Sequence, residues 1–116
     1  MTDQLSRIAA LNDRVRQGLD PRARVVITAA CVAALAERSS PDAMLHAQAE
    51  LLMAIHRCDF APDERAERRR GEVMFQGRPI RFAIDYYDRA LECGSQDPAD
   101  PEITIRVMTI MLPEDD

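Results

Sequence analysis

The order of two hydrophobic patterns is the strongest constraint on what this chain can fold into. Up to about residue 58, apolar residues recur at the three- and four-residue spacing of amphipathic helices, whereas from about residue 71 they follow strand-like patterns. Helices that come first and strands that follow predict an α+β fold. We expect two main helices packed on one face of a mostly antiparallel sheet of about four strands.

The length of the chain fits one domain that needs no metal or disulfide to fold. We divide this single domain, residues 1–116, into a helical N-terminal half (1–58), a charged connector (59–70) and a β-rich C-terminal half (71–112). The connector is rich in charged residues and has little to bury, so we expect a surface loop or a frayed helical turn.

Two helices are predicted in the N-terminal half. Residues 3–17 have apolar positions at helical spacing, with Thr2 or Asp3 able to cap the start and Gly18 able to end the helix. A second helix is predicted over about residues 41–57, because two serines and a proline precede a long apolar stripe.

Four strands are predicted. The β-branched run 25–28 has the pattern of a short buried strand, although residues 29–37 after it could equally be helical. Residues 72–76 and 80–87 form a predicted hairpin. The last run, 103–112, is apolar on both alternating faces and is predicted to be central in the sheet and covered on both sides. A helix starting at residues 100–101 is the alternative for this run, but β-branched residues favour the strand.

The hairpin turn and the strand after it place particular side chains. Gly77 can supply the positive φ of a tight turn, and Pro79 is tolerated at an edge or a strand start. In an extended strand, Asp85 and Tyr87 share one face, while Tyr86 lies on the opposite face. We expect the face with Tyr86 to pack against the core.

The acidity of the chain belongs to one segment. Residues 1–82 carry 13 arginines against 11 acidic residues, whereas residues 83–116 carry two arginines against nine, a balance of −7 that accounts for the net charge of −5. A chain with a net negative charge is poorly suited to binding the negatively charged phosphate backbone, so direct nucleic-acid binding is not expected. The arginine cluster in the connector (Arg65, Arg68, Arg69, Arg70) is interleaved with glutamates and lacks stacking aromatics, which favours a solvated surface run.

Other features predict a protein of the cytoplasm that acts without a cofactor. The N-terminal residues lack the pattern of a secretory signal, and no run approaches the ~18 apolar residues of a membrane span. Three cysteines without a C-x-x-C pair indicate reduced thiols, which we interpret as small buried residues. Glycine-rich phosphate loops are missing from the sequence.

The polar residues of the last third are the candidate site, and we predict that they form an interaction surface: Asp85, Tyr87, Asp88, Asp97, Asp100 and Arg106. The first hypothesis is a non-enzymatic module whose acidic surface binds a partner protein with a basic surface. The alternative is a small metal-dependent hydrolase or nuclease in which the four aspartates hold Mg²⁺. Against a metal site, aspartate before proline is a common turn former. A homo-oligomer is also possible through an edge strand or an uncovered sheet face.

Several segments resemble the bacterial family catalogued as domain of unknown function 3768. They are Ile-Asp-Tyr-Tyr-Asp at 84–88, Gly-Ser-x-Asp-Pro-Ala-Asp-Pro at 94–101, Thr-x-Arg-Val-x-Thr-Ile-Met-Leu at 104–112, and the pieces at 7–13 and 24–28. The chain departs from the family pattern at 64–70 and at Ala83. The resemblance implies a small protein of unassigned activity, often met on plasmids and mobile elements. An inhibitor of a host defence nucleoprotein, of the anti-CRISPR or anti-restriction type, is then a special case of the first hypothesis.

Overall fold

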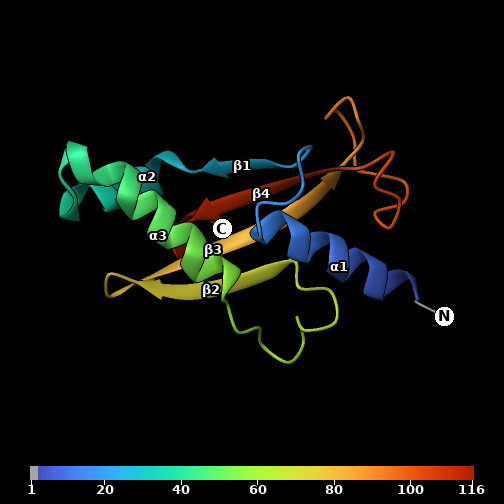
Figure 1. Ribbon diagram of the computed structural model, residues 1–116, viewed down its shortest axis with the longest axis horizontal. Helices are drawn as coiled ribbons and strands as arrows, with labels where there is room; N and C mark the ends of the chain where they lie inside the picture. The colour runs from blue at the N-terminus through green and yellow to red at the C-terminus, as the bar shows by residue number, and fades with distance from the viewer. Residues whose placement is uncertain (1–2) are drawn as a thin grey trace.

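A four-stranded sheet lies at the centre of the structure, a computed structural model that describes residues 3–116 (Figure 1). The strands lie in the order β1-β4-β3-β2, with β1 parallel to β4 and the other neighbours antiparallel. Their bounds are β1 Arg24–Ile27, β2 Arg70–Phe75, β3 Arg78–Tyr87 and β4 Ile105–Met111. The predicted α+β class and mostly antiparallel sheet are confirmed.

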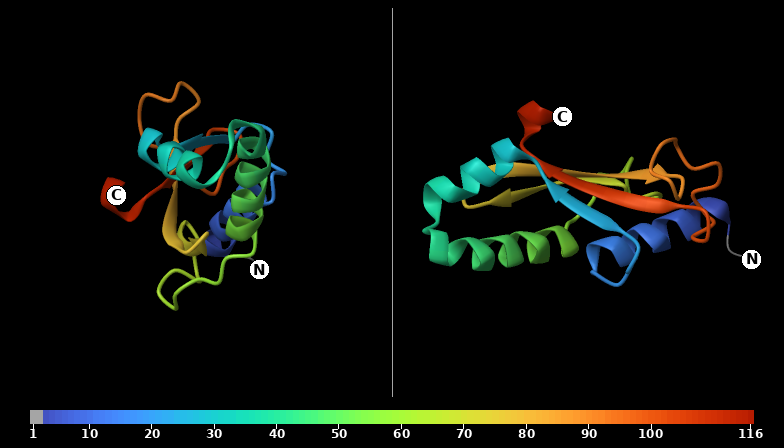
Figure 2. Two further views of the ribbon diagram at one scale, coloured as in Figure 1. Left: turned by 90° about the vertical axis from the view of Figure 1, so that its left-hand side faces the viewer. Right: turned by 90° about the horizontal axis from the view of Figure 1, so that it is seen from above.

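Helices α1 Gln4–Arg16 and α3 Met44–His56 lie against one face of the sheet, which we call the inner face, and α2 Ala29–Arg38 lies across one end of the sheet (Figure 2). Short 3-10 turns occur at Pro41–Ala43 and Pro113–Asp115. The C-terminal segment lies on the opposite, outer face (Figure 2). Among the described residues, none of the helices combines the length and apolar character that crossing a membrane requires.

The helix boundaries follow from the residues at their ends. The Asp3 carboxylate accepts the Ser6 N–H at 2.7 Å, and Gly18 has φ +72° just after α1. The Thr28 side chain caps α2 by accepting the Cys31 N–H at 3.2 Å. Residues 29–38 are therefore helical, which decides the question that the sequence left open.

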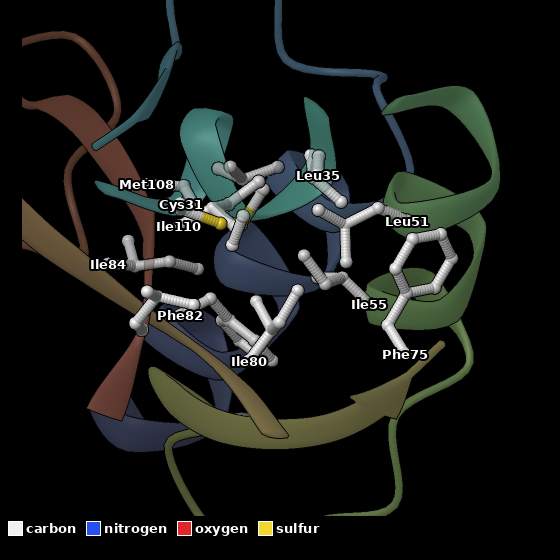
Figure 3. Close-up of a cluster of buried hydrophobic side chains, with 13 residues drawn as sticks. Cys31, Leu35, Leu51, Ile55, Phe75, Ile80, Phe82, Ile84, Met108 and Ile110 are labelled. Carbon is white, nitrogen blue, oxygen red and sulfur yellow. The ribbon is translucent and has the colours of Figure 1, made fainter. Parts of the chain in front are cut away.

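The core lies between the inner face and the helices (Figure 3). Its most buried apolar side chains include Cys31, Leu51, Ile55, Ile80, Phe82, Ile84, Met108 and Ile110, each at most 1% exposed. The alternation along β3 sends every second side chain into this core, so Tyr86 packs against it as predicted.

Two strand predictions are corrected in part. The strand at β1 exists, but it is an exposed edge strand, with Val25 and Val26 45% and 46% exposed, because it pairs with β4 alone. β4 is central as predicted, yet it is covered on one face: Met108 is buried, whereas Val107 and Thr109 on the other face are half-buried. The outer face is covered in part by the C-terminal segment and by no α-helix of the described residues, which explains the difference.

The hairpin turn is as the sequence predicted, whereas two of the three thiols are not. Gln76 and Gly77 have φ +53° and +77°, as a two-residue turn with positive φ at both central positions requires. β2 and β3 are each slightly longer than predicted. Cys31 is buried as expected, but Cys93 is exposed and Cys58 half-buried, so the prediction of three buried thiols is wrong for those two.

Candidate functional site

The six residues predicted to form an interaction surface lie in three separate places. Asp85 and Tyr87 lie on the outer face of β3, as their alternation predicted. Arg106 lies on the inner face of β4. The three remaining aspartates lie in the segment between β3 and β4, residues 88–104, which we call the acidic loop.

The acidic loop carries negative charge that is largely without local counter-ions. It contains five acidic residues and one arginine, a balance of −4. Elsewhere in the last third, Asp85 pairs with Arg69 at 3.0 Å, and Asp116 pairs with Arg70 at 2.8 Å and Arg81 at 3.4 Å, whereas Glu114 and Asp115 have no ion pair among the described residues. Of the acidic segment that the sequence indicated, this loop therefore carries most of the charge without an ion pair.

Each predicted aspartate of the acidic loop closes a turn. Asp88 and Asp100 each accept the backbone N–H of a residue further along the loop, at 3.0 and 2.9 Å. Asp97 accepts the Ala99 N–H at 3.1 Å and the Gln4 side-chain amide at 2.9 Å. These bonds all end on Oδ1, so the second oxygen of each carboxylate is available to solvent or a partner.

The acidic loop is also tied to the sheet by buried side chains of β4 and its approach. The Thr104 hydroxyl donates to the Asp97 carbonyl at 2.9 Å and lies 2.6 Å from the Ser95 hydroxyl. The Ser95 N–H donates to a carbonyl oxygen of β3 at 2.9 Å. Arg106 Nη2 donates to the Pro98 carbonyl at 2.6 Å. The loop is held in one shape by contacts along its length.

Arg106 is a buried anchor, so its prediction as a surface residue is wrong. Its side chain belongs to a residue that is only 2% exposed, and Nε donates to Asn12 Oδ1 at 2.8 Å. The guanidinium carbon lies 4.9 Å from the centroid of the Tyr86 ring. The reason is strand parity, since Arg106 shares a face of β4 with Met108 and Ile110, both in the core.

Tyr86 connects Arg106 to the connector through a polar network under α1. The Tyr86 hydroxyl donates to Glu67 Oε2 at 2.6 Å and accepts from Asn12 Nδ2 at 2.9 Å. Asn12 Nδ2 also donates to the Glu67 carbonyl at 3.0 Å. Burial, assisted by the bond to Glu67, raises the pKa of Tyr86 to about 12. The hydroxyl is therefore protonated at neutral pH and acts as a structural donor.

Three of the four arginines of the connector pair with acids. Arg68 binds both carboxylate oxygens of Asp13 at 2.8 Å each, and Arg16 binds Asp13 at 2.8 Å as well. Burial alone would raise the pKa of Asp13, but these hydrogen bonds and charges lower it below the ordinary value. Arg69 and Arg70 pair with Asp85 and Asp116, whereas the exposed Arg65 donates to the Phe60 carbonyl at 3.2 Å.

Comparison with protein families gives one match. A family model described as protein of unknown function, DUF3768, matches residues 28–115, well over half of the chain. The chain belongs to this family. The part that matches DUF3768 includes Tyr86, the acidic loop and Arg106, whereas Asn12 lies before it. Searches of curated proteins and of solved structures found no match to the chain.

The four aspartates of this DUF3768 chain do not gather as metal ligands. Asp85 lies on the sheet and pairs with Arg69, while the aspartates of the acidic loop close separate turns. Across residues 3–116, no three His, Cys, Asp or Glu side chains form a group that could hold a metal ion. The arrangement that the metal hypothesis predicted, with the four aspartates around one ion, is not found among these residues.

Sequence reasoning missed two residues of the network around Tyr86, Asn12 and Glu67. Asn12 is 0% exposed in α1 and stands four residues after Ile8 and three before Val15, on the apolar side of the helix. A polar residue inside an apolar stripe is a signal that could have been followed. Glu67 had no such signal, because it lies in a charged segment without periodicity.

Proposed function

We propose that this chain is a non-enzymatic protein-interaction module that binds the basic surface of a partner protein through the acidic loop. The observation that carries the proposal is the charge of −4 on a single loop at one end of the molecule. In the described part of the chain, Asp88, Glu92, Asp97 and Asp100 have no cation within 4.0 Å. Their charges are therefore available to attract a basic surface.

The fixed shape of the acidic loop supports the same function. Anchoring by Thr104, Ser95 and Arg106 orders the loop before any partner arrives. A preordered loop loses less conformational entropy on binding, so more of the attraction appears as affinity. The second oxygens of the turn-closing aspartates give the partner acceptors at defined positions.

The chemistry of the acidic loop favours partners rich in arginine or lysine. The nucleic-acid channel of an enzyme is a surface of this kind, and an acidic protein that occupies it excludes the nucleic acid by competing for the same cations. We therefore propose, as the special case, a mobile-element-encoded inhibitor of a host defence nucleoprotein. Electrostatic steering would make association fast at low salt and slower as salt is added.

The test removes charge while keeping the turns. In the triple variant Asp88→Asn, Asp97→Asn and Asp100→Asn, each Asn retains a side-chain oxygen that can accept the same backbone N–H. Quantitative affinity capture from a source-cell lysate, repeated over a series of salt concentrations, compares this variant with the unaltered protein. We expect the specific partners to be lost from the variant and from the unaltered protein at high salt.

A matched control removes three charges elsewhere. The variant Asp42→Asn, Glu50→Gln and Asp63→Asn alters exposed acids of α3, its approach and the connector, so it changes the net charge by the same amount. It should capture the same partners as the unaltered protein. Equal capture by the acidic-loop variant, or equal loss in both variants, would show that the loop is not the binding surface.

A further inference from the structure

A pocket of about 250 Å³ lies beside α1, where the helix meets the turn before β1 and the end of the acidic loop. Its lining includes three arginines and two acids: Arg14, Arg22, Arg106, Asp20 and Glu102. The formal charge of these five side chains is +1, although one of the acids, Glu102, belongs to the acidic loop. The pocket is distinguished by a buried arginine, Arg106, in its lining.

Arg106 is the unusual member of the lining because it is a buried cation without an ion pair. In the described part of the chain, no carboxylate lies within 4.0 Å of its guanidinium, and the hydrogen bonds from Nε and Nη2 end on neutral oxygens of Asn12 and Pro98. Burial lowers the pKa of Arg106, as expected for a desolvated charge. Fully buried arginines normally have an anionic partner.

The hydrogen bonds of Arg106 leave room for such a partner. A guanidinium has five N–H donors, and the two recorded hydrogen bonds, from Nε and Nη2, use two of them. Arg106 forms part of the pocket lining, and Nη1 is its guanidinium nitrogen without a hydrogen bond among the described residues. Thr104, which also lines the pocket, fixes the neighbouring backbone by its bond to Asp97.

Two further arginines are held at the same pocket. Arg14 Nη2 donates to the Leu19 carbonyl at 2.9 Å, and Arg22 Nη1 donates to the Pro101 carbonyl at 3.2 Å. Each bond fixes a guanidinium and leaves other donors unused. Glu102 competes weakly for these donors, because its carboxylate is 3.7 Å from Arg22 in an exposed pair. Asp20 accepts the Arg22 backbone N–H at 3.0 Å.

We propose that this pocket binds a small anion, with the oxygens of a carboxylate or phosphate group accepting hydrogen bonds from Arg14, Arg22 and Arg106. Arginine forks match both groups geometrically, and bonds between charged groups are stronger than neutral ones. The bound anion supplies a counter-charge in direct contact, since Asp20 and Glu67, the acids whose charges act on Arg106, form no ion pair with it in the described part of the chain. The size of the pocket fits a group of a few heavy atoms and its hydration, not a large cofactor.

The test is a nuclear magnetic resonance titration of the full ¹⁵N-labelled chain at constant ionic strength. Inorganic phosphate is the probe in one arm and acetate in the other, with chloride as the balancing anion. We expect saturable shifts of the Arg106 Nε–H signal and of the Thr104 and Arg22 amides with at least one probe. Saturation with phosphate alone assigns a phosphate site, and saturation with acetate alone assigns a carboxylate site.

Variants of the exposed arginines test the location without removing the buried anchor. Arg14→Gln and Arg22→Gln should each raise the Kd of the bound probe about tenfold, the effect of losing one charge-assisted hydrogen bond. Arg57→Gln removes an exposed arginine outside the pocket and should leave the Kd unchanged. Shifts that rise linearly without saturation for both probes, or a Kd that neither pocket variant changes, would overturn the proposal.

Discussion

Removing one oxygen atom from Tyr86 tests whether the polar network under α1 stabilises the fold. In Tyr86→Phe the ring remains against the core, and two hydrogen bonds are lost: the one donated to Glu67 at 2.6 Å and the one accepted from Asn12 at 2.9 Å. Asn12 keeps its bonds to the Glu67 carbonyl and to Arg106. The change is therefore confined to the hydroxyl group.

The expected size follows from those two bonds. A hydrogen bond to an ionised group contributes about 1.5–3 kcal/mol, and one between neutral groups contributes about 1 kcal/mol. Glu67 is half-buried, so its carboxylate can regain water and recover part of the loss. We expect Tyr86→Phe to lower the free energy of unfolding by about 2 kcal/mol. For a domain of this size, that is a fall in Tm of about 8 °C.

Urea denaturation followed by circular dichroism measures this difference, and the next residue provides the control. The Tyr87 side chain lies on the outer face, and its hydroxyl forms no hydrogen bond within residues 3–116. Tyr87→Phe should therefore change the free energy of unfolding by less than about 0.5 kcal/mol. If the two variants lost equal stability, or if Tyr86→Phe lost less than about 0.5 kcal/mol, the network would not have the role argued for it.

Two further predictions concern pH and the anchoring of the acidic loop. Because the pKa of Tyr86 is raised from 10.0 to about 12, its contribution to stability is complete below pH 10 and is lost as the pH rises toward 12. Urea denaturation across that range should show a smaller alkaline loss in Tyr86→Phe than in the unaltered protein. Thr104→Val removes the bond to the Asp97 carbonyl and the contact with the Ser95 hydroxyl, and should cost about 1–2 kcal/mol. Its amide hydrogen exchange should rise at Ala99, and unchanged exchange there would contradict the anchoring role.

The sequence predicted those parts of the fold that depend on local chemistry. The cap at Asp3, the positive φ at Gly77 and the alternation along β3 each arise from residues close in the chain, so each could be predicted from a short window. The exposure of β1 could not, because it depends on β1 being at an edge of the sheet, and strand order is a long-range property.

The contacts of the candidate site could not be predicted from a short window either, because they join residues far apart in the sequence. Arg106 bonds to Asn12, which is 94 positions away, and Tyr86 bonds to Glu67 in a segment without periodicity. No local pattern pairs such residues. Parity did place Arg106 on the same face as Met108 and Ile110, but its charge led us to expect the surface. The strand position of Arg106 therefore predicted its burial better than its residue type did. Hydrogen bonds and the Tyr86 ring compensate part of the free-energy cost of burying its guanidinium.

Arg106 contacts both proposed binding sites, the acidic loop and the anion pocket. Its Nη2 holds the Pro98 carbonyl of the acidic loop, while the same side chain lines the anion pocket. An anion bound there adds negative charge beside the loop and so strengthens its attraction for a basic partner. By thermodynamic reciprocity, a partner that neutralises the loop must strengthen anion binding by the same factor. The two sites are thus expected to bind cooperatively, with a coupling that weakens as salt screens the intervening distance.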